Sequence, residues 1–130
     1  MRVRTCLILL AGLLACAGCG KTKSTDELIA DLKSDHEGDR IKAVRLLPLR
    51  KGDAAKVIPA LTASLKDKES DVRRSAALGL ADFGEAAKEA IPALQEVLRD
   101  KDARTREAAG IALSRIDPAR FPAPSKPRGK

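Results

Sequence analysis

His36 is the one histidine of the chain and the first residue to consider for chemistry, because it stands beside Glu37. A His-Glu pair can supply two ligands to a metal ion, but a stable metal site needs several convergent ligands. No second His-Glu pair occurs, and every cysteine lies within the first 19 residues. We therefore predict no metal site, and we interpret His36 and Glu37 as residues of a solvated link.

Serines and paired acids offer no stronger case for catalysis. A catalytic serine needs a general base, which is most often a histidine. Apart from His36, no histidine is present to activate the serines of the central region: Ser64, Ser70, Ser75 and Ser114. Glu85 and Glu89 are four residues apart on a polar helix face, where solvation is their default role. No glycine-rich phosphate loop opens a helix. We predict no catalytic residue, no cofactor and no enzyme activity.

The three cysteines remain as candidates for covalent chemistry: Cys6, Cys16 and Cys19. They lie in a segment, residues 1–19, that begins with Arg2 and Arg4 and continues as an apolar run. The run is shorter than the roughly 20 residues that span a bilayer, so it is typical of an export signal. It resembles the bacterial lipoprotein signal, in which a leucine and two small residues precede a cysteine that becomes acylated.

Two cysteines fit this lipidation signal. Cys16 has leucine at −3 and alanine at −1, but a large leucine at −2. Cys19 has alanine and glycine at −2 and −1, but a cysteine at −3. We favour Cys16 and keep Cys19 as the alternative. An ordinary secretory signal and a transmembrane anchor are the other interpretations. The resemblance implies a protein of the bacterial cell envelope, lipid-anchored to a membrane and facing the periplasm or the exterior.

The net charge of +7 is concentrated at the two ends of the chain. Residues 5–119 carry 19 basic and 18 acidic residues, which leaves no face of one sign to attract phosphates. We therefore predict no nucleic-acid partner. The last segment, residues 118–130, is basic and rich in proline, which predicts a disordered tail.

The central region repeats itself every 33 residues. Placing residues 58–82 over 91–115 gives ten identities in 25 positions, including the motif IPAL in both copies. A weaker match extends one period earlier, to residues 25–49. Repeats of this length are typical of solenoids. We predict an all-α solenoid of about three helical hairpins over residues 26–117, joined to the signal by a linker at 20–25.

Apolar residues recur at helical spacing within each unit. They predict six helices, at residues 26–34, 39–50, 54–66, 70–82, 87–99 and 103–116. Gly52 and Gly84 are placed to end helices in the left-handed conformation. Asp71 and Asp102, or polar residues beside them, are placed to cap helix starts.

Prolines mark positions within these helices. Pro59 and Pro92 stand in equivalent IPAL motifs, and a proline costs little in the first turn of a helix. We therefore predict that each proline lies in the opening turn of the second helix of its pair. This interpretation moves the first helical residue to Lys56 or Val57 in one pair and to residues 88–90 in the next. Pro48 has no counterpart and falls inside the predicted helix 39–50, which it should kink or shorten.

The helical pair with IPAL, an Asp in the link and VRRSAALGLADFG resembles the HEAT-like repeats found in phycobilisome pigment lyases. In such repeats, a link Asp and an Arg six residues later form a hydrogen-bond ladder between neighbouring repeats. Ser34 replaces the Asp ahead of Arg40, which puts the ladder in doubt at that end. The residues that match the ladder are Asp67, Arg73, Asp100 and Arg106.

Stacked hairpins form extended curved surfaces that serve as binding platforms. The resemblance implies that the second helix of each pair lines the concave side, and this predicts a candidate binding face of mixed charge: Lys56, Ala63, Lys66, Glu89, Glu96 and Arg99. No aromatic anchor lies on this face. We predict a membrane-anchored scaffold for an unknown protein partner. The alternative is a non-catalytic accessory or lyase-like subunit that binds a cofactor-bearing or enzyme partner.

Apolar residues on the first and last helices predict a further contact. These helices have only one neighbouring hairpin each, whereas the ends of repeat arrays need polar outer faces. A partner or a second copy of the chain is expected to cover part of this surface: Leu28, Ile29, Leu32, Ile111, Leu113 and Ile116.

Overall fold

The computed structural model describes residues 22–123, so Cys16, Cys19 and residues 124–130 lie outside the described part. Within that part the chain is helical and contains no strand, which confirms the all-α prediction. The helices are α1 (Thr25–Asp31), α2 (Glu37–Leu46), α3 (Ala54–Ser64), α4 (Ser70–Ala81), α5 (Ile91–Val97) and α6 (Ala103–Ile116). Three 3-10 helices join them: η1 (Leu47–Leu49), η2 (Lys51–Asp53) and η3 (Gly84–Ala90). Across residues 22–123, no helix has the length and apolar character needed to cross a bilayer.

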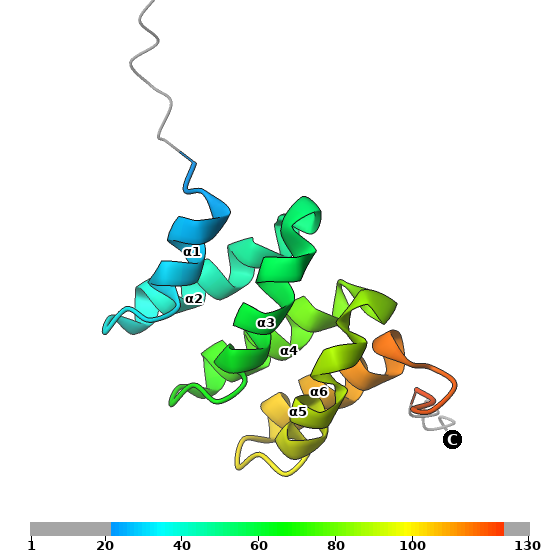
Figure 1. Cartoon of the computed structure of the whole chain (residues 1–130). Coiled ribbons are helices and arrows are strands. Elements are labelled where there is room, and N and C mark those ends of the chain that lie inside the picture. Colours follow the sequence, from blue (N-terminus) through cyan, green and yellow to red (C-terminus); the bar gives the residue numbers. More distant parts are fainter. Residues whose placement is uncertain (1–21, 124–130) are drawn as a thin grey trace, which may run out of the picture.

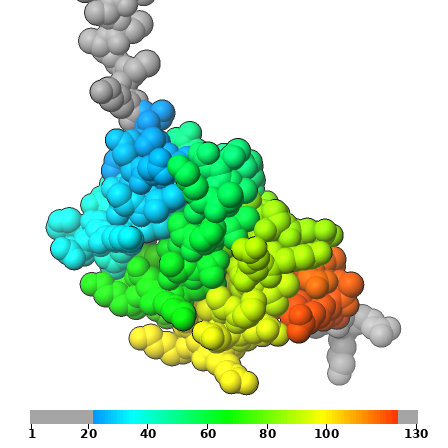
Figure 2. Space-filling view, viewed as in Figure 1, coloured from blue at the N-terminus to red at the C-terminus, as the bar shows by residue number. Residues whose placement is uncertain are grey.

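The helices stack as three successive hairpins in two layers, with α1, α3 and α5 in one layer and α2, α4 and α6 in the other (Figure 1). The coloured segments follow one another across the space-filling view from the blue N-terminal end to the orange C-terminal end (Figure 2). Apolar side chains at the repeated positions meet between the layers and are fully buried there: Val44, Leu61, Leu80, Leu94 and Leu113. The 33-residue period is therefore the period of a continuous core.

The two layers differ in how closely their helices pack. Helix α4 packs extensively on α6 and on α2, whereas α1 makes few contacts with α3, and α3 makes fewer still with α5. Because helices on the inside of a curved solenoid lie closer together than those on the outside, α2, α4 and α6 line the concave side. This geometry differs from the prediction, which assigned the concave side to the layer that contains α3 and α5.

Helix ends follow some of the predicted signals. Asp102 caps α6, with its carboxylate accepting a 2.8 Å hydrogen bond from the Thr105 amide. Gly84 has φ = +53° after α4, as predicted for a left-handed helix end. The prediction for Gly52 was wrong, because this glycine lies in η2 without a positive φ. Asp71 lies inside the first turn of α4, after the N-cap residue Glu69, so it is not the cap.

The prolines divide between confirmed and corrected predictions. Helix α2 ends at Leu46 and the chain continues as η1 around Pro48, which confirms the predicted shortening. Pro92 lies in the first turn of α5, as predicted. Pro59 instead lies inside α3, which begins at Ala54 because η2 leads directly into it. The carbonyl that Pro59 leaves without a donor belongs to exposed Ala55, where water can hydrate it.

The chain makes a turn after α6. The Phe121 amide donates a 2.9 Å hydrogen bond to the Asp117 carbonyl, and the Phe121 ring packs against the core. The predicted disorder is therefore wrong for residues 118–121. The remainder of the predicted tail from residue 124 lies outside the described residues.

Two glycines give opposite stability predictions. Gly84→Ala should lower the free energy of unfolding by about 1 kcal/mol, because an L-residue is strained at positive φ. Gly110→Ala should raise it by about 0.5–1 kcal/mol, because Gly110 lies within α6 and an added Cβ would meet no atom within 4 Å. Urea denaturation of the two variants checks both signs. Equal destabilisation by both would contradict the backbone conformation assigned to Gly84 and the open surroundings assigned to Gly110.

Candidate functional site

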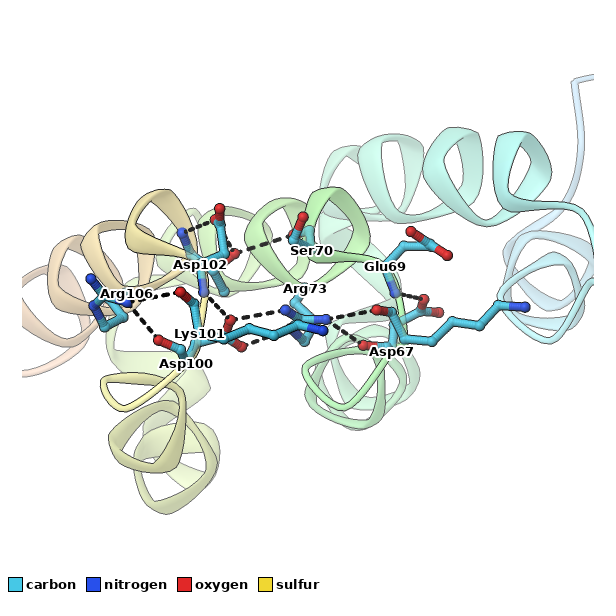
Figure 3. Close-up of polar contacts among 10 residues, drawn as sticks. Asp67, Glu69, Ser70, Arg73, Asp100, Lys101, Asp102 and Arg106 are labelled. Carbon is cyan, nitrogen blue, oxygen red and sulfur yellow. Dashed lines mark hydrogen bonds and ion pairs between the residues drawn. The ribbon is translucent and has the colours of Figure 1, made fainter.

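Arg73 joins two consecutive repeats through four hydrogen bonds (Figure 3). Its Nε and Nη2 donate to the two carboxylate oxygens of Asp100, at 2.7 and 2.8 Å. Its Nη1 donates to the main-chain carbonyls of Asp67 and Lys68, at 2.8 and 3.0 Å. One guanidinium thus fixes its own link and the link of the next repeat. This parallel, two-bond geometry is the one that makes an Arg-carboxylate pair strong and directional.

Arg40 makes the same set of bonds one repeat earlier. Its Nε and Nη2 donate to the Asp67 carboxylate at 2.9 and 3.3 Å, and its Nη1 donates to the Ser34 carbonyl at 2.9 Å. Ser34 therefore does not interrupt the ladder, contrary to the expected weakness. The Ser34 carbonyl accepts the hydrogen bond from Arg40, and the Ser34 hydroxyl accepts a hydrogen bond from the His36 amide at 3.2 Å.

The six-residue spacing of Asp and Arg marks a ladder between neighbouring repeats, as the resemblance implied, and does not mark a carboxylate pair within one link. That spacing places each Arg on the main-chain carbonyls of its own link, as for Arg106 Nη1 on the Asp100 carbonyl at 2.7 Å. The carboxylate bonds run between repeats and join residues that are 27 positions apart, Arg40 to Asp67 and Arg73 to Asp100. The 27-residue separation was present in the sequence and was the signal that could have identified these pairs.

Burial determines what the ladder can do. Arg40 and Arg73 are 4% and 6% exposed, so both guanidiniums lie within the array. The hydrogen bond from Arg73 lowers the pKa of Asp100 and raises the pKa of Arg73, which keeps both groups charged. The hydrogen bonds of Arg73 run to the Asp100 carboxylate and to the carbonyls of its own link. The ladder therefore sets the register of the repeats.

The lowered pKa of Asp100 gives the array a defined dependence on acid. A carboxyl whose pKa is lower in the folded state stabilises the fold above its unfolded pKa and loses that contribution as the pH falls through the folded pKa. We expect the free energy of unfolding to decrease below about pH 4. Asp100→Asn should show a shallower decrease over the same range. Urea titrations between neutral pH and acid test this, and parallel curves for both proteins would contradict it.

The residues predicted to form a concave binding face lie on the convex layer. Ala63, Lys66 and Glu89 line a groove of about 550 Å³ between α3 and the start of the next hairpin. Lys56 instead bonds to Asp26 of α1, with Nζ at 3.0 Å from Oδ1. The other two predicted residues, Glu96 and Arg99, are exposed on α5 and in the turn after it. The structure thus brings together three of the six residues predicted to form the binding face. They lie on the convex layer, whereas the prediction placed them on the concave side.

Three exposed leucines lie on the concave layer and were not identified from the sequence. Leu46, Leu49 and Leu78 are 45%, 72% and 40% exposed, and we call them the leucine surface. Leu49 and Leu78 line a groove of about 300 Å³ between α2 and α4, and Leu46 and Leu49 line a hollow of about 310 Å³ beside it. Leu49 lies in η1, two residues after buried Leu47, and its equivalent one repeat later is the exposed residue Asp82, so the repeat register held a signal for its exposure.

Other predicted residues have simpler positions. His36 is exposed at the start of α2, and residues 22–123 contain no cluster of three or more His, Cys, Asp or Glu side chains that could hold a metal ion. Of the apolar residues expected at the ends of the array, three are already buried within it: Leu28, Leu113 and Ile116. The other three are partly buried: Ile29, Leu32 and Ile111.

Comparisons with known proteins agree with this architecture. The HEAT repeats profile matches residues 25–114, and 14 chains of solved structures match. One belongs to the complex of CpcE and CpcF of phycocyanin lyase from Nostoc sp. PCC7120, with 28% sequence identity and a TM-score of 0.68. The match covers 78% of this chain and 40% of that one, so the chain spans less than half of its relative. No curated protein sequence matches. The chain belongs to the HEAT repeat family.

Proposed function

We propose that the chain is a non-catalytic protein-binding module, held at a bacterial membrane by an acyl group on Cys16 or Cys19. The observation that carries the binding role is the leucine surface, in which Leu49 is 72% exposed between two adjoining hollows. A partner could therefore pack around the Leu49 side chain and place its own side chains in the two hollows beside it. Leu49 lines both hollows, so the leucine surface can present one apolar contact to a partner.

The apolar burial available at the leucine surface is large enough to drive association. Complete burial of one leucine side chain contributes about 1.5–3 kcal/mol, so covering three partly exposed leucines can drive association. Charged groups at the rim can orient the partner: Arg45 and Arg74 line the groove together with Asp82. Arg74 is held by Asp71 at 2.9 Å, which fixes one of these charges in place.

The double substitution Leu49→Ser with Leu78→Ser should weaken partner capture by about tenfold or more, as expected when central interface residues are truncated. Both side chains are exposed, so the melting temperature should stay close to that of the wild type. The matched control is Ala63→Ser with Lys66→Ala, on the convex layer. Affinity capture from envelope extracts gives the readout. Undiminished capture by the leucine variant, or loss of capture by the control alone, would contradict the assignment.

Membrane attachment is the second part of the proposal and has its own test. A Cys16→Ala, Cys19→Ala double variant should appear in the aqueous fraction after detergent phase separation, because a protein without its acyl chain loses its membrane affinity. The single variants identify which cysteine is acylated. Full membrane association of the double variant would contradict lipid anchoring and leave the binding role untouched.

A role as an accessory subunit of an enzyme is the second candidate function. It is favoured by the similarity to a chain in the CpcE and CpcF complex of phycocyanin lyase. Under this hypothesis the captured partner would carry a cofactor or an enzymatic activity. An absorbance spectrum and an identification of the captured protein distinguish this role from a purely structural scaffold.

A further inference from the structure

The Asp-Arg ladder ends differently at the two ends of the array. Arg106 Nη1 donates to the Asp100 and Lys101 carbonyls at 2.7 and 3.2 Å, as Arg40 and Arg73 do in their own links. In those two residues, Nε and Nη2 hold the carboxylate of the following repeat. Among residues 22–123, no carboxylate bonds to Nε or Nη2 of Arg106. The ladder therefore ends on an arginine in the conformation that receives an aspartate.

Other residues at this end also keep the character of an inner repeat. Leu98 is 41% exposed, whereas Leu65 at the equivalent position one repeat earlier is 3% exposed. Gly110 is partly buried, and its equivalent Ala77 is fully buried. We call Leu98, Arg106 and Gly110 the end face. The terminal repeats of arrays that end in solution usually carry polar capping residues at such positions. The end face instead keeps the residue types of an inner repeat.

The opposite end of the array lacks the matching aspartate. Ser34 occupies the position of Asp67 and Asp100, so the first link has no carboxylate at the position that accepts an arginine within the array. On the outer hairpin, Lys23 precedes α1 and pairs with Asp31, the last residue of α1, with Nζ 2.6 Å from Oδ2. Head-to-tail stacking of two copies would therefore leave Arg106 of one copy facing Ser34 of the other. The chemistry favours a different chain as the occupant of the end face.

We propose that the end face binds the first repeat of a second HEAT-type chain, whose link aspartate bonds to Arg106. The end face is a second contact surface, separate from the leucine surface, so the inference goes beyond the proposed function while sharing its protein-binding character. Charge complementarity supports it, because the geometry of Arg106 calls for a carboxylate. The packing within the array supports it as well. The face of α4 that is equivalent to the end face of α6 forms the contact between α4 and α6.

An extended chain tests the geometry of the end face. A copy of residues 84–116 inserted directly after Ile116 continues the 33-residue period and places a copy of Asp100 opposite Arg106. The extended chain should unfold in one transition, with a melting temperature higher by about 4 °C or more. Arg106→Ala should remove most of this gain in the extended chain and change the natural chain little. A protease-sensitive extra repeat, or equal effects of Arg106→Ala in both chains, would overturn the inference.

Affinity capture with the full-length chain tests the occupant. Wild-type protein and Arg104→Ala should retain a protein with helical repeats and a link aspartate, and Arg106→Ala should lose it at least tenfold. Arg104 is the matched control because it is an exposed arginine on the same helix. A partner without such repeats, a second copy of this chain, or a partner retained by Arg106→Ala would overturn the inference and leave the binding function standing. Capture of nothing would contradict both.

Discussion

Asp100→Ala should lower the free energy of unfolding by about 3–5 kcal/mol, the range observed when one partner of a buried ion pair is removed. The substitution leaves the Arg73 guanidinium, whose side chain is 8% exposed, without its carboxylate. It also removes the acceptor of the Asp102 amide, which bonds to Asp100 Oδ1 at 2.9 Å. Because this ladder step joins the second hairpin to the third, the loss should affect cooperative unfolding of the whole array.

Chemical denaturation with helical circular dichroism measures this loss. Asp82→Ala is the matched control, because Asp82 also faces an arginine, Arg115, but at 3.5 Å and with both side chains more than half exposed. The control should change stability by less than about 1 kcal/mol, as is typical of surface pairs. A loss for Asp100→Ala no larger than that of the control would contradict the role of the ladder.

Leu61→Ala should lower the free energy of unfolding by about 2–5 kcal/mol, through lost burial and a cavity that cannot close. Leu61 is fully buried where α3 meets α4. A Cβ added to Gly79 would lie 3.2 Å from Leu61 and 2.7 Å from Pro48, so the side chain of Leu61 packs against bare backbone at a close approach. Tight packing on this side limits the relaxation that could fill the cavity.

Leu49→Ala provides the comparison for this prediction. It deletes the same atoms from a side chain that is 72% exposed, so its cost should stay below about 1 kcal/mol. The two variants should also separate stability from binding, because Leu49 belongs to the leucine surface and Leu61 to the core. Similar stability losses for both would show that the assigned burial is wrong.

Stability of the described array comes from packing and the ladder alone. All three cysteines fall within the first 19 residues, so no disulfide can join the hairpins. Apolar contacts provide most of the favourable free energy, and the ladder determines which repeat faces which. Acid should therefore loosen the register of the repeats through Asp100 before it affects their apolar cores.

The helical hairpins were predictable from the sequence because each depends on local and periodic signals. The 33-residue period fixed the positions of the helices, and apolar residues at helical spacing predicted the buried side, as with Leu61 and Leu94. Pro48 correctly marked the end of α2. These features depend on nearest neighbours along the chain or on exact repetition, and both can be recognised in one sequence.

The candidate binding surfaces were less predictable because they depend on how repeats sit against one another. The direction of curvature follows from the close packing of α2, α4 and α6, and no single helix records it. The polar residue Asp82 at the equivalent position one repeat later marks Leu49 as exposed, but it does not reveal the two hollows that Leu49 lines. Ser34 looked like a defect because its side chain was compared with aspartate, whereas the ladder uses its main-chain carbonyl.

Site-specific photo-cross-linking in the native envelope tests the central claim, that the chain binds a protein through its concave leucine surface. A photoreactive residue placed singly at Leu49, Leu78, Ala63 or Lys66 samples both layers of the same array, whatever the identity of the partner. The account predicts cross-links to a partner from positions 49 and 78 and none from positions 63 and 66. Cross-links confined to positions 63 and 66, or none from any of the four, would contradict it.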